Sequence, residues 1–312
     1  MDRREFLKSA SAALAATTGL QVVQLNAQSL SGAQSFTIGD IKITALLDGF
    51  LPIEASAMFG ITPEEFAAQL QTAFLSGPAH PTGVNAFLIE TGDRRVLVDA
   101  GTGAAFGPTL GQLSESLSAH GIDPASIDTV FATHLHPDHI GGILTEAGNP
   151  FSEAGLMVHP ADIDFWNNDE FKAAAPAEFQ GFFDMARGAV AAFGDKVQSV
   201  EDGAEIAPGL TLMHLPGHTM GHSGLMLESN GAQLLIAGDV VHVPPVQFAM
   251  PAVTIGFDTD QDMARQTRMR VFDMVSSDAV PIAGAHIGFP GLGHLVAEGD
   301  GYRFEPMLWQ FG

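Results

Sequence analysis

The segment THLHPDHIGG, residues 133–142, decides the fold. It concentrates imidazole and carboxylate side chains within six positions: His134, His136, Asp138 and His139. Because alternate residues of an extended chain point to the same side, His134 and His136 can bind one ion from the end of a strand. The proline between the two pairs ends that strand, so we expect Asp138 and His139 to lie on the following turn and face a second ion. Two glycines, Gly141 and Gly142, are expected to let the backbone pass close to the metals without a side-chain clash.

Two ions need further ligands, and three other predicted strands end in suitable residues. The segment PGHTMGH supplies His218 after the strand LTLM, LLIAGD ends in Asp239, and VPIAGAH ends in His286. These donors predict two sites. The first site consists of His134, His136 and His218. The second site consists of Asp138, His139 and His286, and Asp239 is positioned to bridge the two.

The rest of the chain alternates strands and helices, without a low-complexity linker. Two hairpins are expected, at 35–49 and 85–101, each around a Gly-Asp turn. Near-continuous apolar strands such as VLVDA and LLIAG need cover on both faces. The economical architecture therefore has sheets inside and helices outside, in the mixed α/β (α+β) class.

Helices are expected in four regions, two of them marked by capping signals or apolar spacing. One begins at TPEE with a capping box and should present one apolar face, formed by Phe66, Leu70 and Phe74. A second is expected over 108–120, with its apolar face at Leu110, Leu113 and Leu117. Residues 160–193 are expected to be mainly helical, and a further helix is expected at about 259–276.

Composition limits the function. The 312 residues are 46% hydrophobic, which is ample for a packed core. The formal charge of -23 makes nucleic acid an unfavourable partner. Cysteine is absent, so any metal site must use nitrogen and oxygen ligands, which favours zinc and leaves cobalt, manganese and iron as alternatives.

The first 27 residues resemble a twin-arginine export signal. Arg3 and Arg4 precede an alanine-rich run that is too short and too weakly apolar to anchor the chain in a membrane. We therefore expect a signal peptide at 1–27, recognised by the twin-arginine export machinery. A single hydrolase domain over 28–312 would then reach the periplasm or be secreted. The alternative is an ordinary amphipathic N-terminal helix.

The HxHxDH motif with single His, Asp and His residues at distant strand ends resembles the metallo-β-lactamase superfamily. That resemblance implies a four-layer αββα sandwich with two metals between the sheet edges. Longer segments resemble the methyl parathion hydrolase branch, which includes lactonase and arylesterase relatives: GDIKITALLDG, LVDAGTGAAFGPTLGQL, DFW, GFF, AVTIGFDTD and FPGLGHLVAEGDGYRFEP. The resemblance also implies a homodimer.

Several further residues are expected to support the site. Asp99 follows another strand end and is a candidate acceptor for a ligating imidazole, and His222 is a candidate hydrogen-bonding support. By resemblance, four aromatic residues would line the substrate pocket: Phe106, Trp166, Phe183 and Phe257. The other phenylalanines are assigned to the core, and His242 to an ordinary structural role.

The reaction expected from this site is hydrolysis. Two divalent cations sharing a water lower its pKa from 15.7 towards about 7 and so create a bridging hydroxide nucleophile. Asp239 or Asp138 is expected to pass the proton to the leaving group. An aromatic pocket with few nearby cations favours a small, neutral, apolar substrate, with lactones or aryl esters as the native class and phosphotriesters as a promiscuous one.

Four alternatives stay open. Phosphotriester hydrolysis could be the main activity. An acyl-homoserine lactonase is a second alternative, although such enzymes often place a tyrosine over the metals and the one tyrosine here is Tyr302. A non-catalytic metal-binding module and a redox di-iron centre complete the set.

Overall fold

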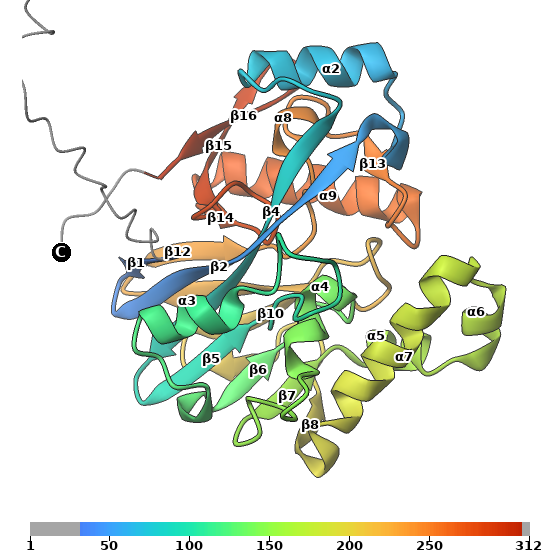
Figure 1. Cartoon of the computed structure of the whole chain (residues 1–312). Helices are drawn as coiled ribbons and strands as arrows, with labels where there is room; N and C mark the ends of the chain where they lie inside the picture. The colour runs from blue at the N-terminus through green and yellow to red at the C-terminus, as the bar shows by residue number, and fades with distance from the viewer. Residues whose placement is uncertain (1–31, 308–312) are drawn as a thin grey trace, which may run out of the picture. The chain divides into compact units, whose positions relative to one another are not determined.

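The computed structural model describes residues 32–307 and contains two large sheets (Figure 1). The expected signal peptide, residues 1–27, lies outside the described residues. The first sheet has the order β1-β2-β4-β5-β6-β7-β8. Its strands are β1 (Ala33–Ile38), β2 (Ile41–Glu54), β4 (Ala79–Thr91), β5 (Arg94–Val98), β6 (Thr129–Phe131), β7 (Gly155–Val158) and β8 (Val197–Ser199).

The second sheet has the order β16-β15-β14-β12-β11-β10-β9. Its strands are β9 (Glu205–Ala207), β10 (Leu210–His214), β11 (Ser223–Ser229), β12 (Ala232–Ile236), β14 (Ile282–Ala283), β15 (Leu292–Glu298) and β16 (Gly301–Pro306). A small third sheet pairs two short strands, β3 (Met58–Phe59) and β13 (Thr254–Ile255).

Helices flank the sheets (Figure 1). They are α2 (Pro63–Thr72), α3 (Leu113–Ala119), α4 (Pro137–Ile140), α5 (Pro160–Trp166), α6 (Asp169–Ala174), α7 (Ala177–Ala191), α8 (Pro244–Gln247) and α9 (Gln261–Ser277). Short 3₁₀ turns are η1 (Ala55–Ala57), η2 (Pro124–Ser126), η3 (Gly141–Ile143) and η4 (Gly194–Lys196). No helix in the described range is long and apolar enough to cross a membrane.

Buried side chains form three layers that hold the sandwich together. Between the two sheets, Phe87 and Phe131 of the first pack with Leu225 and Leu234 of the second. The outer face of the first sheet is covered by α3, α5 and α7, and that of the second by α9. Each fully buried side chain of this size contributes about 1.5–3 kcal/mol. The αββα sandwich expected from the sequence is therefore confirmed.

Local predictions for the strands are confirmed. The hairpin at 35–49 is the antiparallel pair β1–β2, and the hairpin at 85–101 is the antiparallel pair β4–β5. The capping box at the start of α2 is also present, since the Glu65 N–H donates to the Thr62 hydroxyl and the Thr62 N–H donates to the Glu65 carboxylate.

Two details of the helix predictions are wrong. Phe74 does not share the buried face of α2: it lies beyond the helix with a φ of 59° and is 97% exposed, and Leu75 packs inward instead. The second helix begins at Leu113 rather than at 108. The carboxylate of Asp48, on β2, accepts the N–H groups of Gly111 and Leu113 and so fixes the start of α3 from a distant strand.

Candidate metal centre

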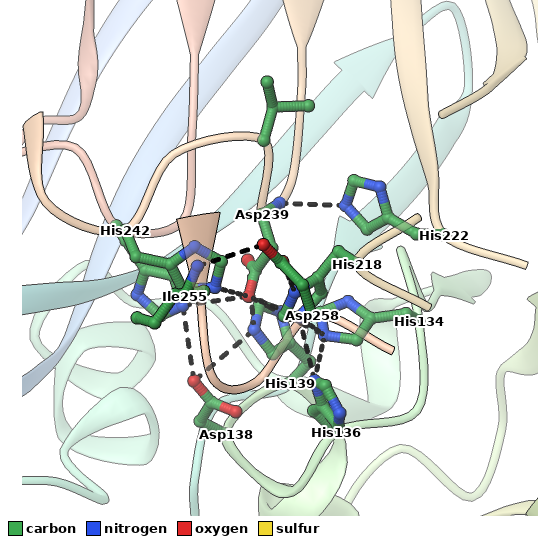
Figure 2. Close-up of polar contacts among 12 residues, drawn as sticks. His134, His136, Asp138, His139, His218, His222, Asp239, His242, Ile255 and Asp258 are labelled. Atoms are coloured by element: carbon green, nitrogen blue, oxygen red, sulfur yellow. Dashed lines mark hydrogen bonds and ion pairs between the residues drawn. The ribbon is translucent and has the colours of Figure 1, made fainter. Parts of the chain in front are cut away.

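The predicted ligands lie at the carboxyl ends of strands from both sheets. In the first sheet β5 and β6 run parallel, and Asp99 and the HxHxDH segment follow them. In the second sheet β12 and β14 are parallel, and β10 runs in the same direction because both β10 and β12 are antiparallel to β11. The topology thereby collects side chains from distant parts of the chain at one edge, as Figure 2 shows.

The first site is a triangle of ring nitrogens. His134 Nε2 lies 2.9 Å from His136 Nδ1, which lies 2.9 Å from His218 Nε2, and the third edge is 3.2 Å. A tetrahedral zinc ion with Zn–N distances of 2.0–2.1 Å would separate its nitrogens by about 3.3 Å. The three nitrogens therefore have nearly the spacing that one zinc ion requires.

The second site is built from an oxygen and two nitrogens. Asp138 Oδ2 lies 3.5 Å from His139 Nε2 and 3.4 Å from His286 Nε2. Asp239 stands between the two sites. Its Oδ1 is 3.3 Å from His139 Nε2, and its Oδ2 is 3.3 Å from His218 Nε2 and 3.1 Å from His286 Nε2. This is the position of a bridging carboxylate, as the sequence predicts.

Two buried atoms at the junction of the sites have no hydrogen-bond partner among the described residues: His139 Nε2 and Asp239 Oδ1. Buried polar atoms are normally satisfied, and an orphaned imidazole nitrogen beside an orphaned carboxylate oxygen suits a cation between them. Imidazole and carboxylate donors without thiolate suit zinc and other borderline divalent metals. The residues present thus fit two metal ions, each held by three of the predicted ligands with Asp239 shared.

Asp99 supports the second site from behind. Its Oδ2 accepts a hydrogen bond from His139 Nδ1 at 2.8 Å, which leaves His139 Nε2 free to face the ions. Its other oxygen accepts the Thr133 N–H at 2.8 Å. Thr133 in turn places its hydroxyl oxygen 3.0 Å from His134 Nδ1. Asp99 therefore lies where the sequence predicts a supporting acceptor.

His222 supports the bridging carboxylate instead of binding an ion. Its Nε2 accepts the N–H of Asp239 at 2.9 Å, while its Nδ1 donates to the carbonyl of Leu215 at 2.7 Å. These partners require the neutral ring, and burial lowers the pKa of His222 to about 3. The backbone of Asp239 is thus held by a histidine that stays uncharged.

The carboxylates and imidazoles perturb one another strongly in the metal-free chain. Burial lowers the pKa of His139, but the carboxylates of Asp239, Asp138 and Asp99 outweigh it and raise the pKa well above its ordinary value. For His218, burial is outweighed by Asp239 and Asp258, and its pKa is raised to about 9. In the metal-free chain these imidazoles therefore favour binding protons, which cations would displace on binding.

Three residues near the site were not predicted from the sequence. Asp258 accepts a hydrogen bond from His218 Nδ1 at 2.9 Å, and Asp162 bonds the backbone of both ligand loops. His242 was assigned an ordinary structural role, but its Nε2 lies 3.2 Å from Asp239 Oδ2 and its ring stacks on His286. Asp258 stands in the segment AVTIGFDTD, where no local pattern marks it as a partner of His218. His242 follows Asp239 by three residues, and that short spacing was the one local signal for its place near the site.

The two glycines of the motif permit a close backbone contact that was not predicted from the sequence. A Cβ on Gly141 would lie 2.1 Å from the carbonyl oxygen of Thr102, and one on Gly142 would lie 2.0 Å from that of Ala100. They let the motif pack against the loop that follows β5. That loop begins with Asp99, so the close approach brings Asp99 to His139.

An aromatic cavity of about 730 Å³ opens over the two sites. All four predicted pocket residues line it: Phe106, Trp166, Phe183 and Phe257. Four phenylalanines assigned to the core line it as well: Phe165, Phe171, Phe179 and Phe182. Six of these eight side chains come from the segment that forms α5, α6 and α7. Among the described residues, no lysine or arginine lines the cavity.

Comparisons with known proteins agree with this geometry. The family model of the metallo-beta-lactamase superfamily matches residues 80–286. The crystal structure of the hydrolase AbOPH, of the beta lactamase superfamily, is 30% identical in sequence and superposes with a TM-score of 0.86. The match covers 91% of this chain and all of the other.

More distant relatives include two curated proteins. A beta-lactamase-like protein 2 homolog of Drosophila melanogaster is 26% identical over 161 residues, which is 51% of this chain and 47% of that protein. The chain thus spans about half the length of this relative. An N-acyl homoserine lactonase of a Bacillus species is 24% identical over 204 residues, 59% of this chain and 74% of the lactonase. The superfamily expected from the motif is confirmed, whereas the methyl parathion hydrolase branch stays a prediction. With two intact ligand sets at the matching strand ends, the chain belongs to the metallo-beta-lactamase superfamily as a metal-dependent hydrolase.

Proposed function

We propose that this protein is a dinuclear zinc hydrolase that cleaves neutral, apolar lactones or aryl esters. The observation that carries the proposal is the position of the two ligand sets on the floor of an aromatic cavity. A cavity of about 730 Å³ is within the usual range for small-molecule sites. Aromatic rings attract apolar and aryl groups, and no lysine or arginine of the described residues lines the cavity to hold an anionic substrate.

The chain's own residues would bind the ions and manage the proton. When bound, two divalent cations supply Lewis acidity, lower the pKa of water towards about 7 and polarise the acyl oxygen. His134, His136 and His218 would hold one cation, and Asp138, His139 and His286 the other. Asp239 would keep the two at a fixed separation, because it lies between the sites and is held by His222.

Asp138 is the better placed of the two candidate proton carriers. Both Asp138 and Asp239 line the cavity, but Asp138 is 19% exposed and Asp239 2%. In the metal-free chain burial raises the pKa of Asp138, but His139 and His286 outweigh it and hold the pKa below its ordinary value. We infer that Asp138 accepts the proton released during attack and passes it to the leaving group. An Asp138→Asn variant that keeps both metals and the full rate would contradict this role.

The ranking of substrates follows from the cavity and from one relative. The similarity to the N-acyl homoserine lactonase from Bacillus supports lactone hydrolysis. The chemistry of a hydroxide held by two metals extends to any carbonyl or phosphoryl centre that fits the cavity. Tyr302 packs against Phe272 beyond α9 and is not among the cavity-lining residues, so an acyl-homoserine lactonase that relies on a tyrosine is disfavoured. Phosphotriester hydrolysis would use the same cavity as a side activity.

The test is kcat/KM for metal-quantified protein on five substrates: an aromatic lactone, an acyl-homoserine lactone, an aryl acetate, a phosphotriester and a β-lactam. We expect an aromatic lactone or aryl ester to lead by tenfold or more, which corresponds to about 1.4 kcal/mol in transition-state stabilisation. A His134→Ala variant controls for contaminating activity. A leading phosphotriester would reverse the ranking, and inactivity on all five would refute the proposal.

We also propose export by the twin-arginine route to the periplasm or beyond, on the strength of the Arg3-Arg4 pair and the apolar run that follows it. Export of a folded protein would allow the metal to be loaded before release. Replacing both arginines by lysine should retain the protein in the cytoplasm, and unchanged export would refute this route. The homodimer implied by resemblance is tested by light scattering.

A further inference from the structure

A fully buried carboxylate on α5 connects the two loops that supply the first site. Asp162 Oδ2 accepts the N–H of Leu135 at 2.9 Å, and its Oδ1 accepts the N–H of Gly221 at 2.8 Å. The side chain is 0% exposed, so both bonds form without competition from water. Each oxygen therefore has its own backbone partner, and the two partners are more than eighty residues apart in sequence.

The two partners are placed beside metal ligands. Leu135 stands between His134 and His136, and Gly221 follows His218 by three residues. One carboxylate thus ties together the loops that carry all three imidazoles of the first site. The corresponding support of the second site comes from elsewhere, since His139 is bonded by Asp99 and His286 Nδ1 donates to the carbonyl of a residue on β4.

The contact between α5 and the His218 loop leaves no room for a side chain at Gly221. A Cβ on Gly221 would lie 2.5 Å from the backbone nitrogen of Asp162 and 2.8 Å from its Oδ1. One helical turn later, Trp166 packs edge-on against the ring of His136 with centroids 5.4 Å apart. The same helix therefore touches the first site at two points and supplies an aromatic wall of the cavity.

We propose that Asp162 is a positioning residue that sets the spacing of His134, His136 and His218 and so tunes the metal affinity of the first site selectively. It touches neither substrate nor ions and acts through the backbone of the two ligand loops. The inference rests on the two-cation centre proposed above.

The expected effect follows from the hydrogen-bond requirements of the two N–H groups. In Asp162→Asn the side chain has nearly the same shape, but its amide nitrogen must face one of two backbone donors and cannot accept from it. One loop is then released. Loss of a supporting partner of this kind lowers metal affinity by about 10–100-fold.

The experiment isolates each site with a background substitution. His286→Ala removes a second-site ligand and leaves the first site to bind zinc, and His136→Ala does the reverse. Zinc affinity is measured by chelator competition with and without Asp162→Asn in each background. We expect a 10–100-fold loss in the His286→Ala background and less than a threefold loss in the His136→Ala background. Asp164→Asn, which makes the same change of charge at an exposed position of the same helix, should change neither.

A second variant approaches the contact from its other side. Gly221→Ala keeps the Asp162 carboxylate but forces the His218 loop away from α5, so it should reproduce the selective loss even if Asp162→Asn folds poorly. Equal losses at both sites in Gly221→Ala would indicate a merely structural role and overturn the inference. An unchanged first site would overturn it as well. If the parent protein binds no zinc, the proposed function fails instead, so the two failures are distinguishable.

Discussion

The role of Asp99 gives the sharpest quantitative expectation for the second site. Asp99 adopts a φ of 62°, a left-handed conformation that asparagine tolerates at least as well as aspartate. The Asp99→Asn substitution therefore changes the hydrogen bonding and the charge without straining the backbone. In the parent, one carboxylate oxygen accepts the Thr133 N–H and the other accepts from His139 Nδ1, both at 2.8 Å.

The magnitude follows from what asparagine cannot do. If its carbonyl oxygen keeps the Thr133 N–H, its amide group faces His139 Nδ1–H, donor against donor. A hydrogen bond to a charged group is worth about 1.5–3 kcal/mol, so the second site should bind its ion about 10–100-fold more weakly. The first site should lose less than fivefold, because Thr133 still holds the loop that precedes His134.

The assay is zinc titration against a chelator in the His136→Ala and His286→Ala backgrounds, with Asp93→Asn as the matched control. Asp93 is exposed in the turn before β5, the strand that leads to Asp99. Unchanged second-site affinity in Asp99→Asn would show that the carboxylate does not orient His139. Equal losses at both sites would show that the substitution disturbs the loop as a whole.

Four further outcomes are expected. At pH 7.5 zinc binding to the metal-free protein should release about two protons, because the pKa of His139 is raised and that of His218 is about 9. Calorimetry in two buffers measures this proton release, and a binding enthalpy that is the same in both buffers would contradict it. The protonated forms of these histidines stabilise the metal-free fold fully below pH 6.5. This contribution to the free energy of unfolding should be lost as the pH rises through about 9, as measured by denaturant titration at a series of pH values. Arg268→Met should lower the free energy of unfolding by about 3–5 kcal/mol. The Arg268 side chain is 1% exposed, and its guanidinium donates to the carbonyls of Val240 and Val253 beside Asp258. A loss below about 1 kcal/mol in urea unfolding would show that these hydrogen bonds do not stabilise the fold. Tyr302→Phe should leave kcat/KM for the leading substrate within twofold, and a tenfold loss would place that phenol in the reaction after all.

The ligands could be found in the sequence because their pattern is local and tied to strand ends. His134 and His136 share a side of an extended segment for geometric reasons, and parallel strands deliver their carboxyl ends to one edge whatever the loops do. Asp258 and Asp162 follow no such rule. His218 lies 40 positions from Asp258, and Gly221 lies 59 positions from Asp162. Only the paths of the loops decide that these carboxylates reach them.

The aromatic residues show a different limit of the sequence. Phenylalanines at helical spacing usually face a core, and Phe183 does pack against the first sheet while lining the cavity. Phe171 on α6 and Phe179 on α7 line the cavity and do not belong to the core beneath these helices. The same periodicity therefore describes a wall of the cavity. Spacing along one helix cannot tell whether the space beside it is filled by protein or by a ligand.

The supports of the two sites come from different layers of the sandwich, and this division has a consequence. The second site depends on the strands, through Asp99 after β5 and the β4 carbonyl that accepts a hydrogen bond from His286. The first site depends on α5 through Asp162, and α5 also carries Trp166 in the cavity wall. Changes in α5–α7 that reshape the cavity for another substrate should therefore alter metal binding at the first site and leave the second site unaffected. Selection on substrate preference then acts on metal affinity at one site only, and a variant with a new preference should lose its first-site ion before its second-site ion on chelation.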